Sequence, residues 1–89
     1  MPKVFITHTV ADVATWLRFK AERAEAVQEL GGTNVVDHVA HEGSAMVAVS
    51  ADVADADAVI ATLASPPSEL AAVMERHGVL PPLVAYVEG

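Results

Sequence analysis

The residues best suited to chemistry in this chain are its four histidines, His8, His38, His41 and His77. Histidine has an ordinary pKa near 6.5, so its ring can take up or release a proton at neutral pH. His8 alternates in phase with the apolar Val4 and Ile6, and a polar ring on an apolar face needs a partner or a cavity. We therefore expect His8 to be the general acid or base of a candidate site. The alternative is a structural ring that is hydrogen-bonded to neighbouring backbone or to a hydroxyl group.

The other three histidines have simpler structural interpretations. His77 precedes Gly78 at an expected helix end, where an imidazole often binds the last carbonyl groups. His41 lies beside Glu42 in an expected turn, where water would surround it. The sequence does not fix which face of its strand His38 occupies, so His38 is kept as a candidate ligand-binding residue.

Four further residues are candidates for ligand binding: Trp16, Phe19, Arg23 and Tyr86. Trp16 and Phe19 would roof a pocket, although aromatic residues on a helix stripe more often pack in a core. Arg23 could hold a carboxylate or an enolate, but a helix arginine beside Glu22 and Glu25 is more often solvated. Trp16 is the sole tryptophan and Tyr86 the sole tyrosine of the chain.

Several kinds of catalytic site are not expected. The chain has no cysteine, which rules out disulfides, thiolate catalysis and sulfur-ligated metals. It has no glycine-rich phosphate loop and no serine nucleophile elbow, and Asp55 and Asp57 are typical of the acidic first turn of a helix. His38 and His41 are three residues apart and would point to opposite faces of a strand. We expect no metal site and no cofactor.

The elements that must position these residues begin with a strand, Val4–Val10, which leads directly into a helix. Asp12 is a suitable N-cap for this helix, which should run as one piece to Leu30 and end at Gly31-Gly32. Its apolar stripe would include Val13, Trp16, Leu17, Lys20, Ala24, Val27 and Leu30. Its opposite face, with Arg18, Glu22, Glu25 and Glu29, would face solvent.

The rest of the chain repeats this arrangement. We expect a hairpin of two strands, Asn34–Ala40 and Ala45–Ala51. A helix, Ala56–Ala64, capped by Asp52 or Asp55, should stop at Ser65-Pro66-Pro67, because prolines remove backbone donors and disfavour helical geometry before them. A further helix would start there, with Ser65 as its N-cap, and end at Gly78. A last strand, Leu83–Val87, would follow Pro81-Pro82.

This element order predicts an α+β fold of the ferredoxin-like βαββαβ type. Such a chain most simply forms a four-stranded antiparallel sheet with spatial order 4-1-3-2 and both helical regions on one face. We expect a single domain over residues 1–89. In this topology all four histidines would lie toward one end of the subunit.

The composition indicates a partner but not a nucleic acid. Hydrophobic residues make up 53% of the chain and the mean hydropathy is +0.39, more than a small monomer hides easily. The net charge of −7, with five Lys and Arg residues, opposes binding to phosphate backbones. No signal peptide or membrane span is expected, which favours a cytoplasmic protein without a membrane partner. A homodimer is the simplest way to cover the apolar surplus, although the alanine-rich composition could also account for it.

Three segments, VFITHTVADVATW, LASPPSELAAVMERHGV and PPLVAYVE, resemble the dimeric α/β-barrel superfamily. This ferredoxin-like group includes antibiotic-biosynthesis monooxygenases, stress-responsive barrel proteins and polyketide cyclases. The resemblance implies a homodimer in which two sheets pack face to face, with a ligand cavity between sheet and helices in each subunit. Activities in the group include cofactor-free oxygenation, cyclisation, haem degradation and chlorite chemistry. The strands NVVDHVA and AMVAVSA contain no aromatic residue, so they are not expected to stack on a flat substrate.

Two functions remain open from the sequence. In one, His8 acts on an aromatic or polyketide-like substrate in a monooxygenase-like or cyclase-like reaction. In the other, the protein is a non-catalytic ligand-binding or structural, stress-related dimer. Ligand pockets usually exceed about 300 Å³. A void of that size at the His8 ring would favour a site, and a fully bonded His8 without a cavity would oppose one.

Overall fold

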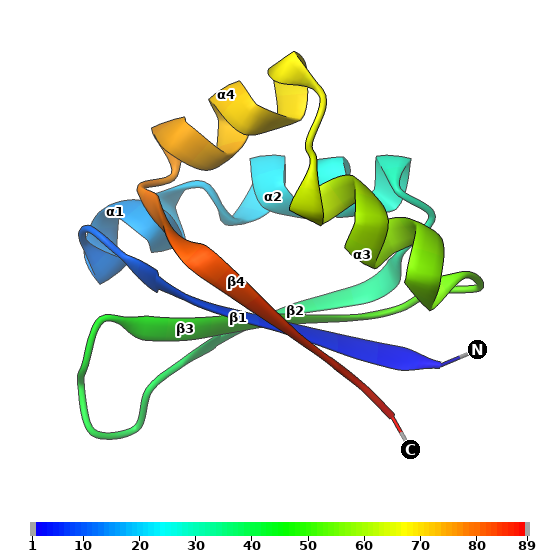
Figure 1. The fold of residues 1–89 in the computed structure, drawn as a ribbon. Coiled ribbons are helices and arrows are strands. Elements are labelled where there is room, and N and C mark those ends of the chain that lie inside the picture. Colours follow the sequence, from blue (N-terminus) through cyan, green and yellow to red (C-terminus); the bar gives the residue numbers. More distant parts are fainter. Residues whose placement is uncertain (1, 89) are drawn as a thin grey trace.

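The computed structural model describes residues 2–88, which form a four-stranded antiparallel sheet with helices over one face (Figure 1). The eight elements in chain order are β1 (Lys3–Val10), α1 (Val13–Arg18), α2 (Lys20–Glu29), β2 (Thr33–Val39), β3 (Met46–Asp52), α3 (Ala56–Ala64), α4 (Ser68–Arg76) and β4 (Val79–Val87). The sheet order is β2-β3-β1-β4. The predicted α+β ferredoxin-like fold and its strand order are confirmed.

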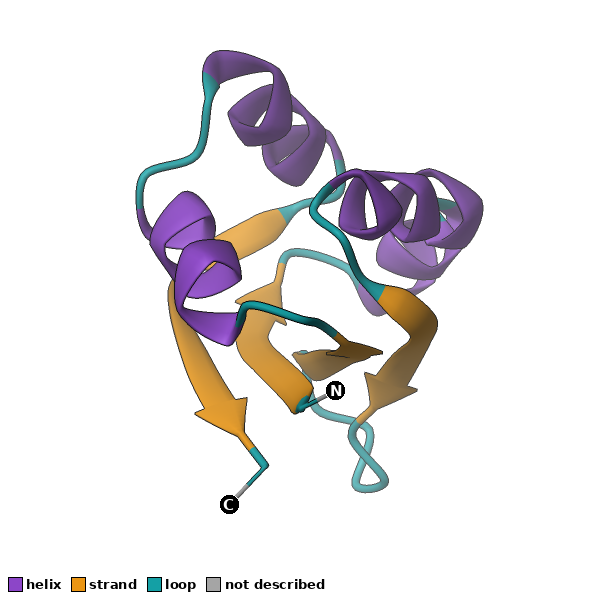
Figure 2. Cartoon of the chain, turned by 90° about the vertical axis from the view of Figure 1, so that its right-hand side faces the viewer, coloured by secondary structure: helices purple, strands orange, loops and turns teal. Residues whose placement is uncertain are grey.

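The two faces of the sheet differ in what covers them, as Figure 2 shows from the side. The inner face, which carries Val4, Ile6, His8 and Val10 of β1, lies under the helices. The register pairs Val4 with Ala51 and His8 with Val47, so these residues of β3 also face inward. Val4 and Ala51 belong to one buried cluster, and Val10 and Val47 to a second that surrounds Trp16. The core therefore lies between the sheet and the helices.

The first helical region differs from the prediction because it is two helices instead of one. The helix breaks at Phe19, whose backbone angles are φ −96° and ψ 19°. Asp12 caps α1 as predicted, since its carboxylate accepts a hydrogen bond from the backbone N–H of Thr15 at 3.1 Å. The side chains that face the sheet also differ from the predicted stripe: Leu17 is exposed, whereas Arg23 is only 7% exposed. The predicted stripe through Leu17 and Lys20 is therefore wrong.

The second helical region is divided where the prolines predict. Helix α3 begins after Asp55, which accepts from the N–H of Ala58 at 3.0 Å, and α4 begins after Pro67. Ser65 ends α3 instead of capping α4, and α4 has no side-chain N-cap. None of the residues of α4 is fully buried, so this helix covers the sheet without entering the core.

The last strand is longer than predicted and includes both prolines. β4 is an edge strand, so a proline that cannot donate a hydrogen bond is tolerated there. The register with β1 shifts between Thr7 and Thr9, opposite the segment that contains Pro81 and Pro82. The strand begins at Val79, and only His77 and Gly78 separate it from the end of α4.

The outer face of the sheet is uncovered in the single chain. Its exposed apolar side chains come from all four strands: Phe5, Val36, Met46, Val84 and Tyr86. Within residues 2–88, no helix has the length and apolar character needed to cross a membrane.

Candidate functional site

A cavity of about 90 Å³ lies between the inner face of the sheet and helices α2, α3 and α4. Its walls are mostly aliphatic and include residues such as Val4, Val27, Val59 and Leu70. Three polar side chains also line it: His8 from β1, Arg23 from α2 and His77 after α4. The cavity is smaller than the roughly 300 Å³ expected of a ligand pocket.

His8 presents one hydrogen-bonding atom that the protein does not use. Its ring is 5% exposed, and Nδ1 lies 3.0 Å from the backbone oxygen of Thr9. A carbonyl oxygen can only accept, so Nδ1 carries the proton and donates. Nε2 is then an acceptor, and the contact of Nδ1 with Thr9 is the one hydrogen bond of the His8 ring among residues 2–88. Burial lowers the pKa of His8 below 6.5. The hydrogen bond to Thr9 raises it and the nearby charge of Arg23 lowers it, and the net shift favours the neutral ring.

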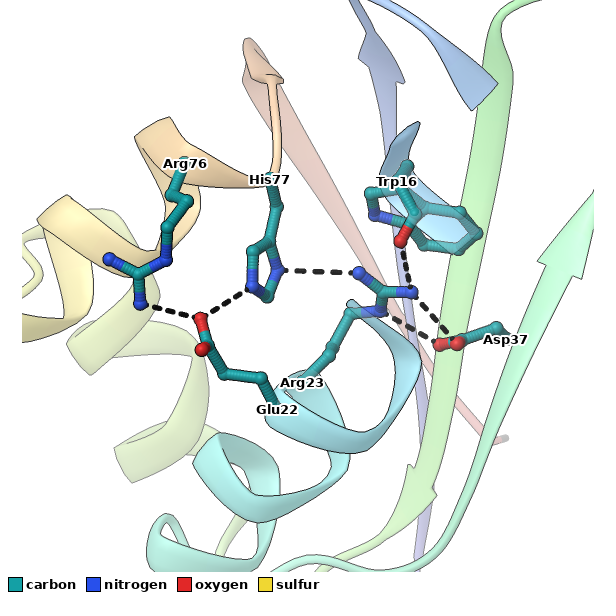
Figure 3. Close-up of polar contacts among 6 residues, drawn as sticks. All are labelled: Trp16, Glu22, Arg23, Asp37, Arg76 and His77. Atoms are coloured by element: carbon teal, nitrogen blue, oxygen red, sulfur yellow. Dashed lines mark hydrogen bonds and ion pairs between the residues drawn. The ribbon is translucent and has the colours of Figure 1, made fainter. Parts of the chain in front are cut away.

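Arg23 is held in the site by a buried ion pair with Asp37 of β2 (Figure 3). Nε donates to Oδ1 at 3.0 Å and Nη2 donates to Oδ2 at 2.9 Å, a two-pronged geometry. Nη2 also donates to the backbone oxygen of Trp16 at 2.9 Å, and the guanidinium carbon lies 3.8 Å from the centre of the Trp16 ring. These contacts fix the guanidinium rigidly.

His77 connects Arg23 to the surface through Glu22. Its Nδ1 lies 3.3 Å from Nη1 of Arg23, and its Nε2 lies 2.9 Å from Glu22, which also pairs with Arg76 at 2.6 Å. The ring stacks on Phe19 with centroids 4.7 Å apart. Burial lowers the pKa of His77, although Glu22 raises it. Hydrogen bonds from Arg76 and His77 lower the pKa of Glu22, which is therefore ionised.

The side chains around the cavity retain hydrogen-bonding groups that a ligand could use. A guanidinium has five N–H groups. Four N–H groups of Arg23 donate to Asp37, to the backbone oxygen of Trp16 and to His77. The fifth, on Nη1, has no partner within residues 2–88. The residues that line the cavity thus include His8, whose Nε2 is a free acceptor, and Arg23, which has one free N–H donor. In the same part of the chain, Nε1 of Trp16 is the one fully buried side-chain polar atom without a partner.

The structure brings together only part of the predicted site. His8 and Arg23 line the cavity, and Arg23 is buried instead of solvated. Trp16 and Phe19 do not line the cavity: Trp16 lies under the Arg23 guanidinium and Phe19 stacks on His77.

The remaining predicted residues lie away from the cavity. His38 is on the outer face, where its Nε2 lies 2.8 Å from the hydroxyl of Ser50 and its ring is 5.7 Å from that of Phe5. Tyr86 is also on the outer face and is 59% exposed. His41 is exposed in the turn between β2 and β3. His77 is the C-cap residue of α4, at the helix end where it was expected, but its ring contacts Arg23 and Glu22 of α2 instead of the last carbonyl groups of α4.

Sequence reasoning missed His77, Asp37 and Glu22, although two of these had a signal. Asp37 alternates in phase with Val35, which packs on the core, and a carboxylate on an apolar face needs a cationic partner. His77 is three and four residues from Met74 and Val73, which places it on the cavity side of α4. Within residues 2–88, no three His, Asp or Glu side chains are grouped as metal ligands would be.

Comparison with known proteins supports the fold. No family model matches the sequence, and no curated protein matches it. A solved antibiotic biosynthesis monooxygenase aligns with a TM-score of 0.64 and 14% identity, over 100% of this chain and 97% of that one. A candidate antibiotic biosynthesis monooxygenase from Deinococcus radiodurans aligns with a TM-score of 0.59 and 14% identity, over 100% of this chain and 93% of that one. The chain therefore has the ferredoxin-like fold that these monooxygenase structures share.

Proposed function

We propose that the protein binds a small, mostly apolar molecule that carries a neutral hydroxyl or enol group, and that His8 takes the proton from this group. The observation that carries the proposal is the free Nε2 of His8 at the wall of an apolar cavity. The free N–H of Arg23 supports it, because it can donate to the oxygen that loses the proton.

The charges around the cavity favour a neutral ligand. The charge of Arg23 is already neutralised by Asp37. The burial of His8 favours its uncharged ring, and the contact of His77 with Arg23 requires His77 to be uncharged as well. A ligand that arrived as a carboxylate would bring an uncompensated negative charge into a buried space, which is costly. A phenol or an enol enters without charge and loses its proton only in the site.

The chemistry we propose is a cofactor-free monooxygenation of an aromatic or polyketide-like substrate. Once the hydroxyl or enol has lost its proton to His8, the electron-rich carbon next to it, which must carry a hydrogen, can pass an electron to dioxygen and combine with it. The proton returned by His8 converts the peroxide anion into a hydroperoxide. Loss of water from the peroxide leaves a carbonyl group, so one oxygen atom enters the product and the other leaves as water. Without oxygen, the electron-rich carbon of the same enolate could attack a carbonyl group of the substrate, which is a cyclisation. The monooxygenase structures with the same fold support the first reaction.

The test is oxygen consumption with hydroquinone and 1,4-naphthalenediol as probes, measured against the uncatalysed rate. We expect uptake with the wild-type protein and its loss in His8→Phe. The matched control is His41→Phe, because His41 is exposed and does not line the cavity. Equal uptake by the His8→Phe and His41→Phe variants would contradict a role for His8.

A non-catalytic ligand-binding or structural dimer is the second candidate. The observation that favours it is the cavity volume of about 90 Å³, which is below the usual range for ligand pockets. This function predicts probe binding, or none, with no oxygen uptake above the uncatalysed rate for either diol.

We also propose that the protein is a homodimer joined through the outer face of the sheet. Phe5, Val36 and Met46 are 37%, 47% and 46% exposed there, and Val84 and Tyr86 add to the same face. Exposed apolar side chains gathered on one face of a sheet are typical of a surface that contacts another protein. Pairing two such faces would bury the His38 and Ser50 hydrogen bond at the interface.

A further inference from the structure

A second, larger hollow lies beside the cavity, between α3, α4 and the edge strand β4. This groove has a volume of about 650 Å³ and opens to the surface. Its lining is almost entirely apolar and includes Ile60, Ala64, Pro66, Ala71, Leu80 and Pro81. Glu75 is the one charged side chain in its lining. The groove has the size that the cavity lacks.

The cavity and the groove have five lining residues in common: Ile6, Leu63, Met74, Val79 and Leu83. On α4 and at its C-cap, Val73 and His77 line only the cavity, whereas Ala71 and Glu75 line only the groove. Met74 lies between these two sets and lines both. The two hollows are therefore neighbours that are separated only by apolar side chains.

The separating wall is the less constrained side of the cavity. Neither Leu63 nor Met74 is fully buried, and no residue of α4 is. Methionine is unbranched and adapts its shape easily. The opposite side of the cavity is rigid, because Arg23 is held by Asp37 and by the Trp16 backbone oxygen. A ligand can therefore displace the wall without disturbing the polar groups.

We propose that the cavity and the groove are two ends of one binding site for an amphipathic molecule. The hydroxyl-bearing head lies against His8 and Arg23, and an uncharged alkyl or acyl tail passes Met74 into the groove. This inference rests on the proposed function for the position of the head. The aliphatic lining accounts for an apolar tail, and Glu75 opposes a tail that ends in a carboxylate.

The test is calorimetric binding of phenol and of the 4-alkylphenols from 4-ethylphenol to 4-hexylphenol. Each methylene group that enters the groove should raise affinity about fourfold, which corresponds to the transfer free energy of one CH₂ group. Ala71→Trp should fill the groove and abolish this dependence on chain length without changing the affinity for phenol. Ala64→Trp places the same side chain on α3 and should have the same effect on affinity. It serves as the test if Ala71→Trp does not fold.

The matched control is Ala72→Trp, on the exposed side of α4 and in the lining of neither hollow. It should retain the full dependence on chain length. Met74→Ala should speed the association of 4-pentylphenol, and an unchanged rate would contradict the role of Met74.

The outcomes separate the groove from the proposed function. If phenol binds but the longer chains gain nothing, the groove inference is overturned and the head site stands. If the gain survives in both groove-filling variants, the tail lies elsewhere and the inference is again overturned. If butylbenzene binds as tightly as 4-butylphenol, the hydroxyl site of the proposed function fails while the groove stands.

Discussion

Nη1 of Arg23 lies 3.3 Å from Nδ1 of His77, and this contact fixes the protonation of the histidine. A guanidinium can only donate, so Nδ1 must be an unprotonated acceptor. The single ring proton is then on Nε2, which donates to the carboxylate of Glu22 at 2.9 Å. His77 is therefore a neutral ring that joins a buried cation to a surface anion.

This relationship predicts that acid destabilises the fold. Burial lowers the folded-state pKa of both His77 and His8 below 6.5, so the unfolded chain binds these protons first as the pH falls. The contribution of these two histidines to the free energy of unfolding should be constant above about pH 6.5. It should fall as the pH drops below 6.5, and it should level off once the pH is below their folded-state pKa values. The measurement is urea unfolding between about pH 5 and 8 at fixed protein concentration.

The control for this prediction is His77→Gln. Glutamine can accept from Arg23 and donate to Glu22, but it does not titrate. The free energy of unfolding should therefore decrease less steeply with falling pH in this variant than in the wild type. The difference should be at most about 1.4 kcal/mol per pH unit, the limit for one proton. An unchanged slope would show that His77 does not carry the pH dependence.

The buried pair of Arg23 and Asp37 predicts a large effect of a small substitution. Asp37→Asn leaves a guanidinium buried without its counter-charge, so the free energy of unfolding should fall by about 3–5 kcal/mol. The double variant Arg23→Met with Asp37→Leu should recover most of this loss. Asp57→Asn, at an exposed position of α3, should change stability by less than about 0.5 kcal/mol. A similarly small effect of Asp37→Asn would contradict the pair's importance.

The cap of α1 predicts a moderate effect. Asp12 accepts from the Thr15 backbone at 3.1 Å and from its hydroxyl at 2.6 Å. Asp12→Ala should therefore lower the free energy of unfolding by about 1 kcal/mol. Glu42→Ala is the control, because it removes an exposed carboxylate from the turn between β2 and β3, where it caps no helix. Equal losses of stability in the two variants would show that the cap of α1 contributes nothing specific.

The proposed dimer predicts which surface tolerates a new charge. Ala48 pairs with Thr7 on the outer face, so Ala48→Glu would bury a charge in the interface and should give monomers or unfolded protein. Ala21→Glu, at an exposed position of α2, should leave the dimer intact. Light scattering should give about twice the chain mass of 9.3 kDa for the wild type and for Ala21→Glu. A wild-type monomer at micromolar concentration would remove the dimer proposal.

The fold could be predicted from the sequence because its signals are local. Asp12, the Ser65-Pro66-Pro67 break and the alternation from Val4 to Val10 each specify nearby backbone geometry, and the structure agrees with all three. The bend at Phe19 could not be predicted, since no proline or glycine marks it. Arg23 is seven residues from Trp16 and four from Val27, a spacing that fits the buried face, but its ion pair with Asp37, fourteen residues away, depends on tertiary packing.

The candidate site was predictable only in part. The phase of His8 on its strand was enough to place it on the inner face. The face of His38 depended on the register between β2 and β3, which the hairpin sequence left open. Tyr86 lies opposite Phe5 and so shares the outer face, which only the pairing of β4 with β1 shows.

The most direct test of the central claim is the ¹⁵N NMR spectrum of the His8 imidazole during titration with 4-butylphenol. The free protein should show Nδ1 protonated and Nε2 unprotonated, in agreement with the contact to Thr9. At saturation, the Nε2 resonance of His8 should shift as it accepts the phenol proton, while the exposed His41 should not respond. An unprotonated Nδ1 in the free protein, or an Nε2 resonance that does not move at saturation, would contradict the assignment of His8 as the proton acceptor.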